Sequence, residues 1–413
     1  MGLMGTDSDD LESLFLSIQE IIRYSCGRPI TIFARGNTAK KTLSLLNDRE
    51  ICGIVDNSPS LWENQELGFV VQNPNIFLQN EGKGSYIVIC TTSFNEVASQ
   101  LKEMGLIPKT DFCMSPLLSD YSTLNNLENL SKSLIFTSGA ALDEEGGLGG
   151  GIYKLNLKCD SWDYDRKISG QSYGLISFNE NYISVSSNRG IFEFDSNFNI
   201  VREKRFPVGV RAHGVCYNKR MNCFYIACSY LDAILVLDEN FNIKNEIKIS
   251  SKYQLNNEPH HHINDCWTDG FSLYVSMFSL TGNWKKEVYD GGVLEFDLKA
   301  NSWTGAVMQN LWMPHNISYI DGSLTILDSL PGYLRRNNCQ IVGQFPAFTR
   351  GLTYDGVYYY IGQSKNRNIS KNIGVSLNTS IDTGIIIFDE KKKVSRFIQL
   401  PSKISEIHSI ICA

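Results

Sequence analysis

The chain has 413 residues, which favours two domains, and its composition of 42% hydrophobic and 20% charged residues indicates a globular protein with a substantial core. The net charge of −6, the pI of about 5.6 and the lack of a long Lys/Arg run argue against nucleic acid as a partner. No apolar run approaches the roughly 18 residues of a membrane span, so no membrane association is predicted. The acidic start lacks the features of a secretory signal, and the 11 Cys include no CxxC pair. Both observations favour reduced thiols and a cytoplasmic location.

Apolar runs alternate with helical patterns in the first 115 residues. Helices are predicted at residues 11–24, at 38–46 with Thr38 as the cap, and at 95–104. Buried strands are predicted at residues 30–34, 51–56, 86–90 and 111–114. This alternation is typical of a parallel sheet covered on both faces. We therefore predict a small Rossmann-like α/β domain over residues 1–115, followed by a linker of residues 116–133.

Three segments of this domain resemble the compact nucleotide-sugar-type Rossmann domains that are fused to sugar acyltransferases and sugar methyltransferases. The segments are 32–36 (IFARG), 53–57 (GIVDN) and 86–90 (YIVIC). The resemblance implies a nucleotide or nucleotide-sugar ligand, with its pyrophosphate at Gly36, Asn37 and Thr38 and a ribose hydroxyl at Asp56. The turn has only one of the three glycines of a Gly-x-Gly-x-x-Gly fingerprint. The alternative is a docking domain without a ligand, in which Gly36 serves only a tight turn.

One phrase, Gly-apolar-x-x-apolar-Asp/Asn, recurs through residues 134–413. Its copies begin at residues 151, 190, 292 and 384, with weaker copies at 233 and 332, so they are spaced 39 to 59 residues apart. A four-stranded propeller blade takes about 40–45 residues, so six copies predict an all-β six-bladed propeller. Residues 406–412 lack following strands, and we expect them to close the ring against residues 134–138. The Gly-rich segment 144–151 lacks the Lys-Ser/Thr of a phosphate loop, which favours an inter-strand loop.

A second phrase recurs in register with the first: a large polar residue, usually a small one, then an aliphatic one. We interpret it as the start of each innermost strand, so that one side chain per blade converges on the propeller axis. These six axial positions are Tyr173, His213, His261, His315, Arg350 and His408. All six His of the chain lie at or beside them.

Imidazoles from different blades at one end of a narrow channel predict a mononuclear metal site. The predicted ligands are His213, His315, His408 and either His261 or His262. The repeat register selects His261, whereas a bulge beside Pro259 would select His262. An all-His site suits a transition metal such as Fe(II), Zn, Mn or Cu. Asp265 and Glu406 are candidates for orienting the imidazoles, and the alternative is a polar channel without metal.

Arg350 and Tyr173 occupy the two axial positions without His. Arg350 could bind a carboxylate or phosphate bidentately, and Tyr173 could act as a catalytic acid or base. The alternative is that both only pack and form hydrogen bonds in the channel. Lys365 and Arg367 follow in the same blade and are expected to be solvated.

This constellation resembles propeller metalloenzymes with axial His, such as the four-His carotenoid-cleaving oxygenases and the amidating lyase propellers. Four phrases also resemble an uncharacterised bacterial family of six-bladed propellers over about residues 134–413. They are residues 261–265 (HHIND), 313–316 (MPHN), 327–329 (LDS) and 348–351 (FTRG). The second resemblance implies a fold and no reaction.

Two hypotheses of function follow. The first is a metal-dependent lyase, hydrolase or oxygenase that acts on an anionic small molecule or a sugar-linked substrate. The second is a non-catalytic binding module, in which the propeller and the N-terminal domain assemble a biosynthetic complex of the surface-saccharide type with protein partners.

Overall fold

The structure, a computed structural model, describes residues 13–140, 149–159, 161–186, 189–207, 209–253, 257–337, 340–367 and 378–413. It divides into two compact units, Met1–Asn129 and Leu130–Ala413. Residues 144–148 of the Gly-rich segment 144–151 lie outside the described residues, as do residues 1–12 at the start of the chain.

The first unit contains a mixed sheet with the strand order β3-β4-β2-β1-β5-β6 in the described residues. The strands are β1 (Ile30–Phe33), β2 (Ile51–Val55), β3 (Gln65–Glu66), β4 (Phe69–Gln72), β5 (Tyr86–Ile89) and β6 (Phe112–Met114). All neighbouring pairs are parallel except β3 with β4, which is antiparallel. The central strands β1 and β5 are buried along their whole length, because helices and loops cover both faces. The unit is thus a small mixed α/β sheet, and the finer Rossmann-like assignment stays a prediction.

The helices of this unit are short and follow local capping signals. In the described residues they are α2 (Ile18–Ser25), α3 (Asn37–Leu45), η1 (Pro59–Leu61), α4 (Pro74–Phe77), α5 (Phe94–Glu103), η2 (Pro116–Leu118) and α6 (Ser119–Glu128). The helix predicted over residues 11–24 starts at Ile18 in the described residues, and residues 13–17 are not helical, because Ser17 and Glu20 form a capping box. Gly36 is the N-cap of α3, so Thr38 lies in the first turn of that helix and is not its cap. The segment predicted as a linker, residues 116–133, contains η2, the ten-residue α6 and the first residues of β7.

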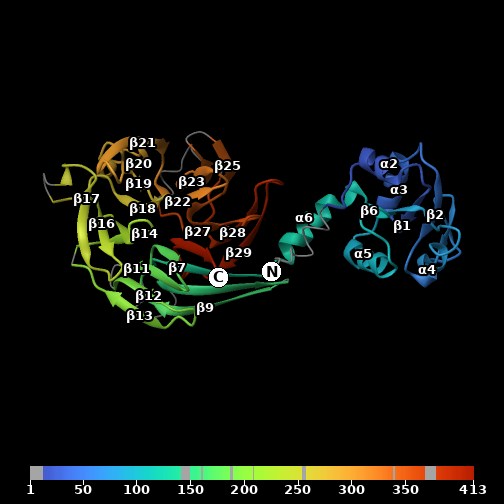
Figure 1. The fold of residues 1–413 in the computed structure, drawn as a ribbon, viewed down its shortest axis with the longest axis horizontal. Helices are drawn as coiled ribbons and strands as arrows, with labels where there is room; N and C mark the ends of the chain where they lie inside the picture. Colours follow the sequence, from blue (N-terminus) through green and yellow to red (C-terminus); the bar gives the residue numbers. More distant parts are fainter. Residues whose placement is uncertain are drawn as a thin grey trace. The chain divides into compact units, whose positions relative to one another are not determined.

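In the second unit, the described residues form six four-stranded antiparallel sheets, and the predicted six-bladed β-propeller is confirmed (Figure 1). The inner strands are β10 (Leu175–Phe178), β14 (Ala212–Asn218), β18 (Ile263–Thr268), β22 (Pro314–Ile320), β26 (Phe348–Tyr354) and β30 (Ser409–Cys412). The second strands are β11 (Asn181–Ser186), β15 (Cys223–Cys228), β19 (Ser272–Met277), β23 (Ser323–Asp328), β27 (Tyr359–Ser364) and β7 (Lys132–Ser138). The third strands are β12 (Gly190–Phe194), β16 (Ala233–Asp238), β20 (Gly291–Asp297), β24 (Tyr333–Arg336), β28 (Thr383–Asp389) and β8 (Gly151–Lys158). The outer strands are β13 (Ile200–Lys204), β17 (Ile243–Lys248), β21 (Ser302–Leu311), β25 (Gln340–Gln344), β29 (Val394–Leu400) and β9 (Ser161–Ser169). A 3-10 turn, η3 (Trp284–Lys286), lies between β19 and β20.

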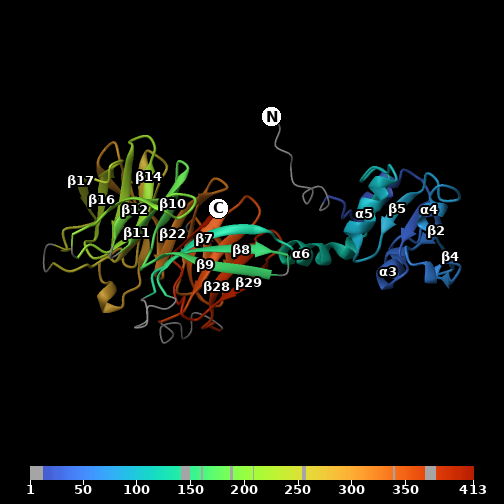
Figure 2. The same cartoon turned by 90° about the horizontal axis from the view of Figure 1, so that it is seen from below.

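The last strand of the chain completes the sheet that the first propeller strands begin. β30 pairs antiparallel with β7, with Ile410 opposite Phe136. Figures 1 and 2 both place the C-terminus beside β7. His408 and Ser409 also bind Thr137, through its backbone carbonyl and its hydroxyl respectively. Strand pairing across about 270 residues of sequence therefore closes the ring.

Irregularities at the start of the inner strands control which side chains face the axis. The pairing register shifts between Ala212 and Gly214, between Ile263 and Asp265, between His315 and Ser318, and between Arg350 and Leu352. A bulge twists its strand and redirects the neighbouring side chains. Three blades thus carry a distortion at His213, His315 or Arg350, and in the fourth the distortion begins two residues after His261.

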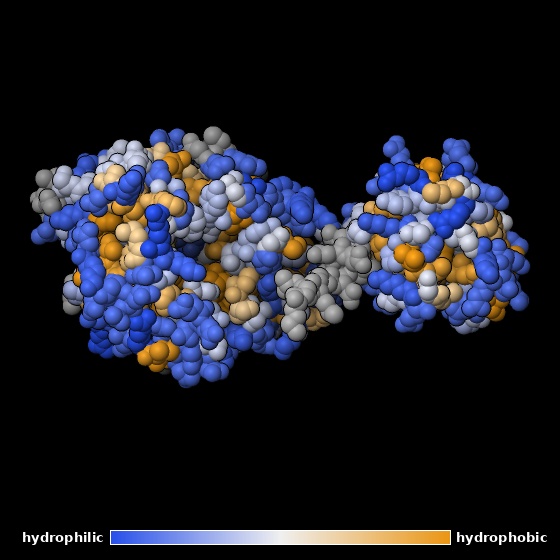
Figure 3. Space-filling model, in the orientation of Figure 1, coloured by the Kyte–Doolittle hydropathy of each residue, from blue (hydrophilic) through white to orange (hydrophobic). Residues whose placement is uncertain are grey.

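The surface in view in Figure 3 is mainly hydrophilic, with apolar residues gathered in smaller patches. Among the helices of the described residues, none is both long and apolar enough to cross a membrane.

We predict that loss of a single buried side chain of β30 weakens the closed ring. Ile410 is 1% exposed, so Ile410→Ala should lower the free energy of unfolding by about 2–5 kcal/mol through lost burial and a cavity. Ile381 is 65% exposed, and the matched change Ile381→Ala should stay within about 0.5 kcal/mol of the parent protein. Urea unfolding of both variants measures the difference, and equal midpoints would contradict the role given to β30.

Candidate functional site: an axial cavity lined by imidazoles and guanidinium groups

A cavity of about 490 Å³ lies where the starts of the inner strands converge. Five of the six blades supply polar side chains to it. These are Arg211 and His213 at the start of β14, His262 and Asn264 at the start of β18, His315 on β22, Arg350 on β26, and Glu406 and His408 before β30. The volume lies within the range of small-molecule sites, about 300–1,000 Å³.

Four of the five predicted metal ligands lie at this cavity: His213, His262, His315 and His408. The ring centroid of His213 is 5.7 Å from that of His408 and 6.2 Å from that of His262. Phe278 stacks on His262 and meets His315 edge-on, so it lies between these two imidazoles. The imidazoles therefore border one space from different blades.

His261, the residue that the repeat register selects, does not line the cavity in the described structure. Its Nδ1 lies 2.9 Å from the backbone carbonyl of Ser279, and its Nε2 lies 2.7 Å from Ser250 Oγ. His262 takes its place with a left-handed backbone, φ 52°. The Asp232 carboxylate causes this geometry, because it accepts hydrogen bonds from the backbone N–H groups of residues 260, 261 and 262. The sequence carries no local signal for Asp232, which lies about 30 residues earlier.

The four imidazoles of the cavity are neutral near pH 7. Burial lowers the pKa of His262 to about 3 and that of His408 to about 4. Burial likewise holds the pKa values of His213 and His315 well below their usual range, and nearby Arg211 and Arg350 add to this effect. A neutral imidazole keeps one nitrogen lone pair, so each ring can accept a proton or a metal ion.

Hydrogen bonds set the tautomers of two rings. His315 Nδ1 donates to the Met313 carbonyl at 2.9 Å and contacts Ser329 Oγ at 2.8 Å, which leaves the lone pair on Nε2. His408 Nε2 lies 3.1 Å from the Glu406 carboxylate and donates to it, which leaves the lone pair on Nδ1. His213 Nε2 and His262 Nδ1 are buried without a hydrogen-bond partner among the described residues.

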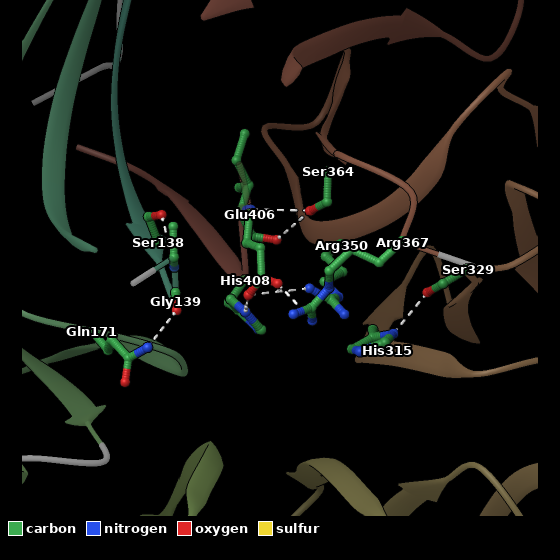
Figure 4. A network of polar contacts seen from close by, with 12 residues as sticks. Ser138, Gly139, Gln171, His315, Ser329, Arg350, Ser364, Arg367, Glu406 and His408 are labelled. Carbon is green, nitrogen blue, oxygen red and sulfur yellow. Dashed lines mark hydrogen bonds and ion pairs between the residues drawn. The ribbon is translucent and has the colours of Figure 1, made fainter. Parts of the chain in front are cut away.

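A cationic cluster borders the imidazoles, as Figure 4 shows around Glu406. Glu406 Oε1 lies 2.6 Å from Arg367 Nη2, and Glu406 Oε2 lies 3.6 Å from Arg350 Nη1. Burial opposes ionisation of Glu406, but Arg350 and His408 outweigh it and bring its pKa well below the usual range. Arg350 is 9% exposed, and its Nε has no partner among the described residues. Arg211 and Lys285 also line the cavity, whereas Glu406 and Glu287 are its acidic members.

Arg211, which was not predicted from the sequence, and Glu406, which was, show how residues of the site could be found in the sequence. Each lies two residues before an axial His, and Met313 and Phe348 likewise precede His315 and Arg350 by two. These four residues all border the same cavity, as expected of side chains two residues apart in an extended segment, although Met313 itself has a left-handed backbone with φ 55°. Arg367, expected to be solvated, also lines it, although its side chain is 66% exposed.

Tyr173 lies behind the imidazoles. Its ring stacks on His213 with centroids 4.5 Å apart, and it meets His408 edge-on at 4.7 Å. Tyr173 is 1% exposed and is not one of the described residues that line the cavity. Its position supports the orientation of His213 and His408, while Arg350 borders the cavity directly.

Asp265 borders a second, smaller cavity of about 240 Å³, which residues of all six inner-strand segments line. Its carboxylate accepts a hydrogen bond from the backbone N–H of Ile317 at 3.0 Å and so links two blades. Glu406 contacts the imidazole of His408, whereas the partner of Asp265 is this backbone group. Protein surrounds the carboxyl group, and burial raises its pKa to about 7.

The structure gives no preformed coordination shell. Within the described residues, no three His, Cys, Asp or Glu side chains are arranged to hold a metal ion. The metal site, and the choice among Fe(II), Zn and Mn, therefore stay predictions.

The residues predicted to bind a nucleotide lie at one edge of the N-terminal sheet. Gly36 caps α3 after β1, Asn37 and Thr38 form the first turn of α3, and Asp56 follows β2. Gly36 has φ −67°, so its backbone conformation does not require glycine. Asp56 Oδ1 accepts from the backbone N–H of Ser58 at 2.9 Å. A nucleotide ligand stays a prediction.

A family model with the description "Domain of unknown function (DUF4915)" matches residues 163–412. No curated protein matches the chain.

Similar solved structures include a chain of a nidogen/laminin complex, with 12% identity over 68% of this chain and 97% of that chain at a TM-score of 0.45. A protein of unknown function from Bacteroides caccae has 13% identity over 68% and 98% of the two chains at a TM-score of 0.47. A calcium-binding protein, regucalcin, from Agrobacterium tumefaciens has 11% identity over 56% and 75% at a TM-score of 0.40. No function is taken from likenesses of this degree.

We predict that Asp265 makes stability depend on pH. The folded protein keeps a proton on Asp265 up to a pKa of about 7, whereas an unfolded chain releases it near pH 3.9. Between these values the folded state binds more protons, so the contribution of Asp265 to stability is lost as pH rises. Asp265→Asn should therefore melt several degrees above the parent protein at pH 8, and this difference should shrink toward pH 4. Melting curves across this range measure it, and a difference that is independent of pH would refute the assignment.

Proposed function

The chain belongs to the family described as Domain of unknown function (DUF4915), and from the site we propose that it is an enzyme that binds an anionic small molecule in the axial cavity. The observation that carries this proposal is the position of Arg350, a guanidinium buried beside neutral imidazoles with an unpartnered Nε in the described structure. A carboxylate or phosphate oxygen is the acceptor that such a group binds best.

The charge balance of the cavity supports an anion. Glu406 is shared by Arg350 and Arg367, so one carboxylate faces two guanidinium groups. Arg211 adds a third, and its guanidinium lies over the rings of Tyr173 and Tyr230. Because burial weakens solvent screening, an anion would interact more strongly here than on an exposed surface.

Neutral imidazoles beside this anion site supply acid–base groups for a reaction. Buried His213 Nε2 and His262 Nδ1 have no protein partner among the described residues, so a ligand can contact them without breaking a hydrogen bond. The lowered pKa values keep these rings unprotonated at neutral pH. An anion bound beside them would raise those pKa values toward neutrality, where a His acts best as a general base. Arg350 would hold the anionic group, and the imidazoles would face the rest of the ligand.

The anion proposal predicts that Arg350→Gln weakens binding of phosphate or acetate by at least about tenfold, because a charge-assisted hydrogen bond is worth about 1.5–3 kcal/mol. Titration calorimetry of the full chain measures this. Arg189 lies away from the cavity and forms an ion pair with Glu203, in which Nη1 and Oε2 are 3.4 Å apart. Arg189→Gln is therefore the matched control and should leave anion binding unchanged. If Arg350→Gln binds both anions like the parent protein, the cavity is not the anion site and the non-catalytic binding module becomes the better hypothesis.

A transition-metal ion on the imidazoles is a second proposal, which the tautomers favour. His315 donates its Nδ1–H to a backbone carbonyl and His408 donates its Nε2–H to a carboxylate. Metal-binding His residues commonly make these two kinds of hydrogen bond through the nitrogen that does not bind metal. A bound metal would polarise an oxygen of the ligand or activate water. The rings would have to turn toward one point for this, since the described side chains form no coordination shell.

The metal proposal predicts near-stoichiometric Fe, Zn or Mn in purified protein, measured by elemental analysis. His213→Ala with His315→Ala should remove the metal while circular dichroism stays that of a folded propeller. His261→Ala is the matched control and should keep the metal, because His261 binds Ser250 and Ser279 instead. Full occupancy in the double variant would exclude these residues as ligands.

A further inference from the structure

The axial cavity has an apolar wall as well as its charged one. Phe278, Trp284, Tyr289 and Met313 line it together with the cationic residues. Phe278 and Met313 belong to a buried cluster with Leu330 and Phe348, against which Trp284 and Tyr289 pack. The Trp284 ring centroid lies 4.5 Å from that of His262, so the wall reaches the imidazoles.

One long connection builds most of this wall. The link between β19 and β20 runs over residues 278–290, whereas the equivalent links of two other blades run only over residues 229–232 and 329–332. The extra residues carry Trp284 and Tyr289 to the cavity. A blade needs only a short turn at this place, so the additional length is not explained by closing the sheet.

Hydrogen bonds at both ends hold this connection in place. Ser279 Oγ donates to Asp290 Oδ1 at 2.5 Å, and the backbone N–H of Thr281 binds Asp290 Oδ2 at 3.1 Å. His261 binds the Ser279 carbonyl, and Trp284 Nε1 donates to the Pro259 carbonyl at 3.2 Å. The wall is therefore preorganised, which reduces the conformational entropy lost when a ligand binds.

From this combination we infer that the ligand is an amphiphilic anion: a carboxylate or phosphate attached to an aromatic or alkyl body that packs on Trp284 and Tyr289. The inference rests on the proposed anion site and adds the chemical class of the rest of the ligand. A sugar body would place several hydroxyl groups against Phe278, Met313 and Trp284, where hydrophobic surface offers them few partners. An aromatic ring would instead stack on Trp284 and remove apolar surface from water.

The test compares ligands with one anionic group and different bodies. Inorganic phosphate, phenyl phosphate and glucose 6-phosphate form one series, and acetate with phenylacetate forms a second. Titration calorimetry with the full chain should give phenyl phosphate and phenylacetate at least about tenfold tighter binding than phosphate and acetate. Glucose 6-phosphate should bind no tighter than inorganic phosphate.

Variants assign the difference to the wall. Trp284→Ala should abolish the advantage of the phenyl ligands and leave phosphate binding within about twofold. Trp284→Phe should keep most of the advantage, because it retains an aromatic surface and loses only the hydrogen bond to Pro259. Trp162 is 41% exposed on β9, so Trp162→Ala is the matched control. If Trp284→Ala does not fold, Tyr289→Ala tests the same wall.

The outcomes separate the two proposals. Binding of phosphate that depends on Arg350, with no gain for the phenyl ligands, overturns the amphiphilic class and keeps the anion site. Tighter binding of glucose 6-phosphate than of phenyl phosphate overturns it in favour of a sugar ligand. Equal losses for phosphate and phenyl phosphate in Trp284→Ala also overturn it. If Arg350→Gln leaves the dissociation constants of all these ligands unchanged, the proposed function itself fails.

Discussion

The pairing of β30 with β7 closes six sheets into one ring, and the axial cavity depends on that closure. Glu406 and His408 directly precede β30, so the strand that closes the ring also brings these two side chains to Arg350 and Tyr173. Without this pairing, β7 and β30 would each present an open edge, and the starts of the inner strands would not face one another. Architecture and site are therefore consequences of one long-range interaction.

Convergence on the axis removes polar side chains from water, and desolvation then governs their chemistry. The imidazoles respond by remaining neutral, since a charged ring would lose its hydration without a matching partner. Arg350 cannot respond in this way, because a guanidinium stays protonated, and it takes Glu406 as a partner. One carboxylate shared between Arg350 and Arg367 leaves an excess of positive charge at the cavity, which the proposed anion would balance.

Elements beside the inner strands refine this cavity. The Asp232 carboxylate accepts hydrogen bonds from three successive backbone N–H groups, and His262 then faces the axis. His261 points away from the axis and forms a hydrogen bond with Ser279 in the β19–β20 connection. That connection in turn carries Trp284 and Tyr289 to the cavity. The adjacent residues His261 and His262 thus have different roles. His261 supports the connection that carries the apolar wall, and His262 borders the cavity.

The sequence by itself determined the six-bladed propeller, because one strand phrase recurs six times, every 39 to 59 residues. The same repetition brought out His213, His315, Arg350 and His408, which lie at equivalent places in different blades and so must converge. Only the tertiary structure decided between His261 and His262, since the choice depends on a carboxylate from the preceding blade and a left-handed residue. It alone also decided that Arg211, Arg367 and Trp284 join the cavity and that Tyr173 lies behind it. The burial of a side chain and its contacts with other blades cannot be read from the repeat pattern, because they arise between segments that are distant in sequence.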